Sequence, residues 1–537
     1  ILAKLMMDNQ NIGYAYHLPT GGFLLKCRNA LSQFSDIFSE FNKYIAPAYH
    51  HDRCERSVQM RLYSMHKREF VMVFLGFYVC FGLGVFIGLA GPPITVTTSF
   101  KGSELLHKQN ISGDIFSGPF IIGSPAMSTY NQQLWVIAVV KTDNKDDDIL
   151  DRSFHVSVAI EALTAEHKAV TLLHSDRAHN RTHHLRCKGQ VCDQVTILHI
   201  EFLDFTHYIL KVFFYGLETF HQHYTIKEVT FYFKSYNPGF TQIEIWFRFI
   251  FLLATFCITC WFAHTLRKFP IFDWSIEQKW MSCMLPLLLL YNNPIFPLTF
   301  LVNSWIPGML DALFQASFLC GLLLFWICIY HGLRQTERRF LTFYLPKLII
   351  VGPLWFSAIA MATWQKANEL QDPTYSYKLD SSNFYNFKIL FFVFIGIYVI
   401  YLLCLILRAY SELRSMPFFD MRLKFLTLLM LIVIAFSIAI TVMRFGIGVI
   451  EDNFVSELST TYTSSAQFMS FYGLLNFYMY TMAYVYSPSK KTVFDTSITK
   501  DNPAFSMIND SDEDVIYGSD EESRQPLNRS RNEDDSD

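Results

Sequence analysis

Eight long stretches of the 537-residue chain carry almost no charge. A hydrocarbon core about 30 Å thick needs roughly 20 residues of helix, because each residue advances about 1.5 Å. Seven stretches contain no Asp, Glu, Lys or Arg, and the eighth holds only Glu244 and Arg248 near one end, where long side chains snorkel to the interface. The sequence therefore predicts eight membrane spans: 70–90, 243–263, 281–302, 312–330, 348–365, 389–407, 425–443 and 466–486.

Basic residues gather on one side of these spans. Five Lys and Arg residues lie shortly before the first span, whereas only Lys101 closely follows it. The later short loops hold 11 Lys and Arg residues on the side of the N-terminus and three on the other side. Since short cytosolic loops are enriched in Lys and Arg, we expect both termini in the cytosol. The 21-residue first span is long for a cleaved signal peptide, so we expect it to be retained behind a largely flexible segment, 1–69.

The segment 91–242, between the first two spans, has a different pattern. Short runs rich in Val, Ile, Thr and aromatic residues alternate with polar turns, which is typical of a β-sandwich. We expect strands at 94–100, 133–141, 154–162, 168–174, 195–202, 208–215 and 224–234. By the charge rule this all-β domain lies outside the cytosol, and a seven-helix bundle (243–486) and a tail (487–537) follow it.

Two motifs in the β-domain favour a lumenal or extracellular location. Asn110 and Asn180 each begin an Asn-x-Ser/Thr acceptor for glycosylation. Cys187 and Cys192 are spaced to close a small hairpin with a disulfide. Four histidines, at 174, 179, 183 and 184, lie close to Cys187 in the sequence. They indicate a metal site, a pH sensor or simply a solvated polar loop. Because no other Cys pair in the domain completes a zinc pattern, we predict no metal.

Polar residues also occur inside the predicted membrane region. Asn292, Asn293 and Pro294 interrupt the third span near its middle, which indicates either a ligand or ion site or a kink packed against a neighbouring helix. Asp311 begins the fourth span and Arg444 ends the seventh on the same outer side, so the two form a pair at the mouth of the bundle or lie unpaired at the interface. These five residues are our candidates for a bundle cavity.

The tail at 487–537 is acidic, with 13 acidic and 6 basic residues, 6 − 13 = −7. Such a stretch has too few apolar residues to fold alone. Asn502, Pro503 and Phe505 form an Asn-Pro-x-Phe turn of the kind that cytosolic endocytic adaptors read. We therefore predict a disordered tail with a sorting motif, and a merely solubilising tail is the alternative.

Signals of enzymes and of nucleic-acid binding are absent from the sequence. It contains no Gly-rich phosphate loop, no His-Glu-x-x-His helix and no Gly-x-Ser-x-Gly elbow. Only 17% of the residues are charged, and the net charge is −3. We predict no catalytic residue, no enzymatic activity and no nucleic-acid partner.

The order of these parts resembles the GOLD-domain seven-transmembrane family that contains Wntless. The residues that carry the resemblance stand in matching order and spacing: Gly308, Asp311, Phe325-Trp326, His331, Glu337-Arg338 and Tyr486-Ser487-Pro488-Ser489. The resemblance implies a lumenal GOLD-like domain packed on a receptor-like bundle with a lipid-facing cavity. We predict no cofactor, and a bound lipid in that cavity is the alternative. Wntless carries a lipid-modified secreted ligand, but its cargo-contacting surfaces are not matched by motifs in this chain.

Our principal hypothesis is a non-enzymatic receptor or escort in the secretory pathway. It would bind a secreted or lumenal protein or lipid through the β-domain and bundle cavity and cycle between Golgi or endosomes and the plasma membrane, with membrane lipids and sorting adaptors as partners. A signalling seven-helix receptor is favoured by the helix count, and a channel or transporter by the Asn-Asn-Pro break. Against these stand the missing Asp-Arg-Tyr motif and the lack of a second interrupted helix.

Overall fold

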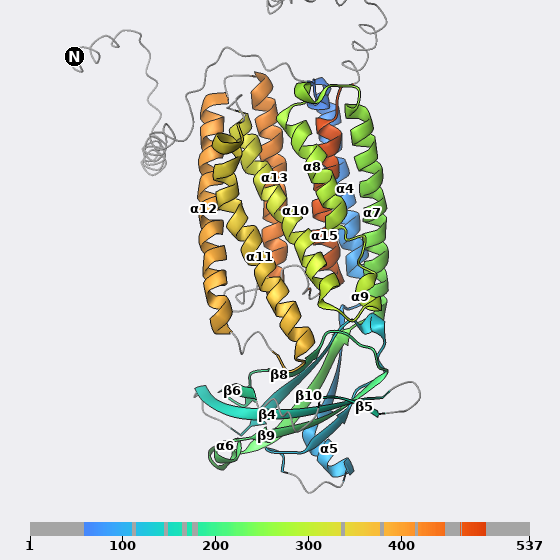
Figure 1. Cartoon of the computed structure of the whole chain (residues 1–537), viewed down its shortest axis with the longest axis vertical. Helices are drawn as coiled ribbons and strands as arrows, with labels where there is room; N and C mark the ends of the chain where they lie inside the picture. Colours follow the sequence, from blue (N-terminus) through green and yellow to red (C-terminus); the bar gives the residue numbers. More distant parts are fainter. Residues whose placement is uncertain are drawn as a thin grey trace, which may run out of the picture.

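The apolar and the β-rich segments form two separate bodies joined end to end (Figure 1). The computed structural model describes residues 58–109, 114–143, 149–163, 169–173, 181–333, 339–375, 381–413, 417–445, 462 and 464–489. A bundle of long helices stands on a β-domain, which confirms the predicted class of a multi-pass helical membrane protein with an all-β domain.

Long helices occupy all eight predicted spans. They are α4 (Lys67–Ala90), α7 (Pro238–Leu266), α8 (Ile276–Tyr291), α10 (Trp305–Gly332), α11 (Leu345–Gln371), α12 (Ser381–Leu413), α13 (Pro417–Phe445) and α15 (Ser465–Tyr486). Within the described ranges, six helices are long and apolar enough to cross a membrane: α4, α7, α10, α12, α13, and α11 with the preceding turn η4 (Phe340–Tyr344). The other two are α8, which has only 16 residues, and α15, which carries more polar side chains.

The third span does not extend over 281–302 as predicted. Ser275 and Gln278 form a capping box that starts α8 five residues earlier, and the helix ends at Tyr291. Asn293 then adopts a left-handed conformation (φ 50°), and Pro294 and Pro297 lack the N–H that a helix needs. The chain continues through the one-turn α9 (Leu298–Leu301) to α10, so the break lies at the end of the span beside the β-domain.

The first span is part of the bundle rather than a separate anchor. Helix α4 packs along α15, and at Gly88 an added Cβ would lie 2.6 Å from the Cα of Ala466. Residues 58–65, inside the segment predicted as largely flexible, also pack on the bundle: the short α3 (Arg61–Ser64) buries Leu62, and the Arg61 N–H donates to the Ser487 carbonyl (2.8 Å). The described residues before α4 and after α15 therefore lie together at the end of the bundle away from the β-domain (Figure 1).

Ten antiparallel strands build the β-domain. They are β1 (Thr95–Lys101), β2 (Phe120–Gly123), β3 (Leu134–Thr142), β4 (Ile149–Leu163), β5 (Ala169–Leu173), β6 (Arg181–Lys188), β7 (Val191–Cys192), β8 (Val195–Ile200), β9 (His207–Tyr215) and β10 (Ile226–Tyr236). One layer has the order β1-β10-β3-β8, and the other has β2, β9 and β4, with β5 and β6 along the far edge of β4. Two short helices, α5 (Gly102–Gln109) and α6 (Glu218–His223), complete the domain.

The core of the β-domain lies between these layers. Phe214 of β9 stacks on Phe231 of β10 with ring centroids 6.1 Å apart, and Phe120 of β2 contacts both rings. All seven predicted strands are present, and three further strands, β2, β6 and β7, were not predicted. The alternation of apolar and polar residues is not visible in β6, because a histidine, His183, takes one of its buried positions.

The predicted disulfide is present between Cys187 of β6 and Cys192 of β7, which are directly paired across the strands. It closes the tight turn that links the two layers of the sandwich. Asn110 and Asn180, the predicted glycosylation acceptors, lie outside the described residues.

Candidate functional site

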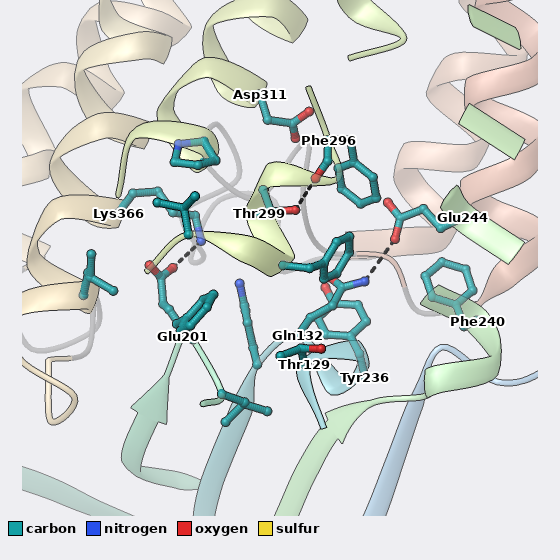
Figure 2. A pocket seen from close by; sticks show the side chains of 18 of the residues that line it. Thr129, Gln132, Glu201, Tyr236, Phe240, Glu244, Phe296, Thr299, Asp311 and Lys366 are labelled. Carbon is teal, nitrogen blue, oxygen red and sulfur yellow. Dashed lines mark hydrogen bonds and ion pairs between the residues drawn. The ribbon is translucent and has the colours of Figure 1, made fainter. Parts of the chain in front are cut away.

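A cavity of about 140 Å³ lies where the β-domain meets the bundle (Figure 2). We call it the vestibule. Its walls come from the β-domain loops, the start of α7, the α8–α10 connection, α10 and the end of α11. The residues that define it are Gln132, Glu201, Glu244, Arg248, Phe296, Thr299, Phe300, Gly308, Asp311 and Lys366.

The start of α7 fixes one wall of the vestibule. Strand β10 runs directly into α7, where the Asn237 side chain accepts from the Gly239 N–H and Pro238 occupies the first turn. The Thr241 hydroxyl donates to the Tyr130 carbonyl (2.8 Å), and Gln132 Nε2 donates to both Thr241 Oγ1 (3.0 Å) and Glu244 Oε2 (3.2 Å). Gln132 holds this position with a φ of 55°, a conformation that non-glycine residues rarely adopt. A side chain of the β-domain is thus locked onto the first helix of the bundle.

Arg248 is the centre of a buried ion network. Its Nε and Nη2 donate to Glu244 Oε1 (3.1 and 3.0 Å), and its Nη1 donates to Asp311 Oδ1 (3.2 Å). The guanidinium also lies 4.2 Å from the centre of the Phe296 ring. Arg248 and Glu244 are only 6% and 7% exposed, so the prediction that they snorkel to the interface is wrong. Because the α8–α10 connection covers them, they pair inside the protein instead.

The two amides of the α8 break have different partners. Asn293 Nδ2 donates to Asp311 Oδ1 (2.6 Å), and Gln315 Nε2 donates to Asp311 Oδ2 (2.8 Å), so both carboxylate oxygens of Asp311 are occupied. Asn292 Nδ2 instead reaches Thr255 Oγ1 (2.8 Å) and Asn476 Oδ1 (3.0 Å) on neighbouring helices. Asn293 therefore holds Asp311 in the wall of the vestibule, Asn292 ties the break to the neighbouring helices, and both line a second cavity beside the vestibule.

A second ion network joins the β-domain to α11. Lys366 Nζ bonds to Glu201 Oε1 and lies 3.6 Å from Glu369 Oε2, and His199 Nδ1 lies 3.7 Å from Glu369 Oε1. The His199 backbone N–H donates to the Pro373 carbonyl (2.7 Å) just beyond α11. Burial raises the pKa of the Glu201 carboxyl to about 7, even though the Lys366 ammonium acts to lower it. We call these four side chains the joint.

An apolar groove lies beside the vestibule. It has a volume of about 300 Å³ and runs between α7 and the α8 break, with Trp246, Phe249, Leu252, Pro294 and Pro297 in its walls. Arg248 and Phe296 line both the groove and the vestibule. Trp246 and Phe249 are exposed on the outer face of α7, so the groove opens toward the lipid.

The predicted site residues have mixed outcomes. Asn293 and Asp311 come together, Pro294 lines the groove, and Asp311 is paired with Arg248. The side chain of Arg444, in α13, lies outside the described residues, as do the sorting-motif residues Asn502, Pro503 and Phe505. Six residues of the two ion networks were not predicted as site residues from the sequence: Arg248, Glu244, Lys366, Glu201, Glu369 and His199. For Glu244 and Arg248 the sequence did contain a signal, because a charged pair four residues apart in an otherwise apolar span is typical of a functional site.

One group in the described chain has the donor types of a metal site. His199, Glu201 and Glu369 offer ligand atoms within 4.8 Å of one another. The ammonium of Lys366 already lies beside the two carboxylates, so a side chain of the protein supplies the positive charge there. His183 and His184 are neighbours on β6 and point to opposite faces, one buried and one exposed, whereas His174 and His179 lie outside the described residues.

Comparison with known proteins divides the chain at the same point as the fold. Residues 118–236 match the family model described as TMEM181, GOLD domain, and residues 237–490 match the one described as Wntless-like, transmembrane domain. Human transmembrane protein 181 is 52% identical over 464 residues, which cover 86% of this chain and 94% of the relative. The predicted resemblance is therefore confirmed. With its GOLD domain, its Wntless-like helices and this degree of identity, the chain belongs to the Wntless-like membrane-protein family that includes transmembrane protein 181.

Proposed function

We propose that this protein is a non-enzymatic receptor or escort that binds a secreted or lumenal protein or lipid ligand with an apolar chain. The observation that carries the proposal is the meeting of two unlike spaces at Arg248: a polar vestibule under the β-domain and an apolar groove open to the membrane. A ligand with a polar part and an apolar chain fits both at once.

The electrostatics support an amphiphilic ligand rather than a free anion. Each cation in the vestibule wall is paired with carboxylates, Arg248 with Glu244 and Asp311, and Lys366 with Glu201 and Glu369. The polar part of the ligand would therefore be held by hydrogen bonds and the aromatic walls, and most of the affinity would come from burying its chain in the groove.

The test is labelling with a photoactivatable fatty acid in cells that express the full-length protein. We expect crosslinked peptides from 245–252 and 292–297. The variant Leu252→Trp fills the groove and should reduce labelling several-fold, because Leu252 lines it. The matched control is Leu253→Trp, which adds the same bulk on the neighbouring, 55% exposed position facing lipid. Equal labelling of the two variants would refute the groove as the binding site.

The transport part of the proposal rests on the tail. With the β-domain in the lumen and both termini in the cytosol, Asn502, Pro503 and Phe505 would be accessible to endocytic adaptors. Antibody uptake should slow in Asn502→Ala and Phe505→Ala relative to the wild type. Substituting Ser506→Ala, next to the motif, is the control; uptake that is identical in all forms would remove the cycling role while leaving ligand binding intact.

A further inference from the structure

The joint holds an unequal number of charges in a buried place. His199 and Glu201 come from the β-domain, and Lys366 and Glu369 come from α11. The Lys366 ammonium supplies one positive charge beside the two carboxyl groups of Glu201 and Glu369. The side chains of Glu201 and Glu369 are only 10% and 7% exposed. Two carboxylates this close and this dry do not both ionise readily, so the cluster requires one more proton.

The hydrogen bonds of the Glu369 carboxylate indicate where that proton lies. Glu369 Oε1 accepts from Gln365 Nε2 (2.7 Å), but Glu369 Oε2 is buried without a hydrogen-bond partner. Its nearest cation, Lys366 Nζ, is 3.6 Å away, which is too long for a good hydrogen bond. A proton on Glu201 supplies the missing donor between the two carboxyl groups.

His199 and Tyr236 are the other titratable groups beside the two carboxyl groups. His199 stacks flat on Trp135 (ring centroids 5.1 Å apart) and directs Nε2 to Gln133 Oε1 (3.2 Å), which leaves Nδ1 facing Glu369. Tyr236 of β10 is the remaining titratable neighbour, on the Lys366 side. The cation beside both carboxyl groups is the Lys366 ammonium, which bonds to Glu201 and lies 3.6 Å from Glu369.

We propose that the Glu201 carboxyl holds a proton while the β-domain is docked on α11 and releases it when the joint opens, so that rising pH loosens the joint. Glu201 and Lys366 also line the vestibule, so opening would widen the ligand site. The role of this latch in ligand release depends on the function proposed above. The latch itself does not, and its test uses ligand-free protein.

The direction of the pH effect follows from linkage. The pKa of Glu201 is about 7 when docked, compared with about 4.3 for an exposed glutamate. A raised pKa stabilises the docked form fully below the lower value and loses that effect as pH rises through the higher one. Between these limits one proton is released on opening, so the opening equilibrium should grow nearly tenfold per pH unit.

The experiment is hydrogen exchange of the full-length protein in lipid nanodiscs, from about pH 5 to about pH 8, corrected for the intrinsic pH dependence of exchange. The reporter is the peptide containing the His199 amide, whose hydrogen bond to Pro373 crosses the joint. The expected result is protection at low pH that falls nearly tenfold per unit toward neutrality. A flat wild-type profile would overturn the proposal without any variant.

Three variants identify the proton carrier. Glu201→Gln mimics the protonated form and should give protection that no longer depends on pH. His199→Gln should keep the wild-type slope. Glu161→Gln, which changes a partly exposed glutamate paired with Lys211 in the same domain, is the matched control and should also keep it. A slope that disappears in His199→Gln but persists in Glu201→Gln, or zinc that protects the wild type at neutral pH, would overturn the assignment.

Discussion

Replacing Arg248 with methionine tests whether the buried ion network is real. Methionine fills much of the space of the arginine but leaves Glu244 and Asp311 in the wall of the bundle without a cation. Removing one partner of a buried ion pair costs about 3–5 kcal/mol. The amide donors that remain, Gln132 on Glu244 and Asn293 and Gln315 on Asp311, offset part of this loss but carry no charge. We therefore expect the free energy of unfolding to fall by about 3 kcal/mol or more.

The assay is reversible unfolding of the purified protein in mixed micelles of increasing SDS content, followed by circular dichroism. A triple variant, Glu244→Gln with Arg248→Met and Asp311→Asn, supplies the decisive comparison. It removes all three charges while keeping the shapes, so it should recover most of the stability lost by Arg248→Met alone. A loss under about 1 kcal/mol in the single variant, as for an exposed pair, would show that Arg248 snorkels after all.

Three further predictions concern helix packing, the core of the β-domain and the disulfide. Gly88→Ala forces α4 and α15 apart and should cost about 1–3 kcal/mol in the same assay, whereas Gly82→Ala, with no atom within 4 Å of the new Cβ, should cost almost nothing. Phe214→Ala empties the centre of the β-sandwich and should cost about 3–5 kcal/mol, measured by urea unfolding followed through β-domain fluorescence. Replacing Cys187 and Cys192 together by serine opens a ring closed over a sequence separation of five residues and should cost about 2 kcal/mol; no change in the urea midpoint would contradict the disulfide.

The elements were predictable because their signals are local. A charge-free run long enough to cross a bilayer predicts a helix without reference to any other part of the chain, and a run rich in Val, Ile and aromatic residues at 208–215 predicts β9 in the same way. The helix break was also visible, since Pro294 removes a backbone donor and the amides of Asn292 and Asn293 need polar partners. Its position was misjudged because the capping box at Ser275 shifts α8 toward the N-terminus, and that cap was overlooked in a span defined by hydropathy alone.

The partners in the site were not predictable for a physical reason. For Asp311 the sequence left two possibilities, a pair with Arg444 at the same membrane depth or no partner at all, and in the structure it pairs with Arg248, 63 residues earlier. Depth is a one-dimensional property, whereas pairing depends on which helices are neighbours, and only packing decides that. Lys366 was likewise counted as a loop charge, because nothing local shows that the end of α11 reaches Glu201 of the β-domain.

The attachment of the β-domain determines how the vestibule can open. The two chain connections to the bundle, α4 to β1 and β10 to α7, lie side by side, since the Asn237 N–H donates to the Ile94 carbonyl (2.7 Å). Gln132 reinforces this edge through Thr241 and Glu244. In the described chain the opposite edge meets α11 through the non-covalent joint and the His199–Pro373 hydrogen bond. A domain fixed along one edge and held by ions along the other opens by rotating about the fixed edge. Hydrogen exchange should therefore report opening at β8 and the end of α11 while the start of α7 stays protected, and equal loss of protection at both edges would contradict this hinge.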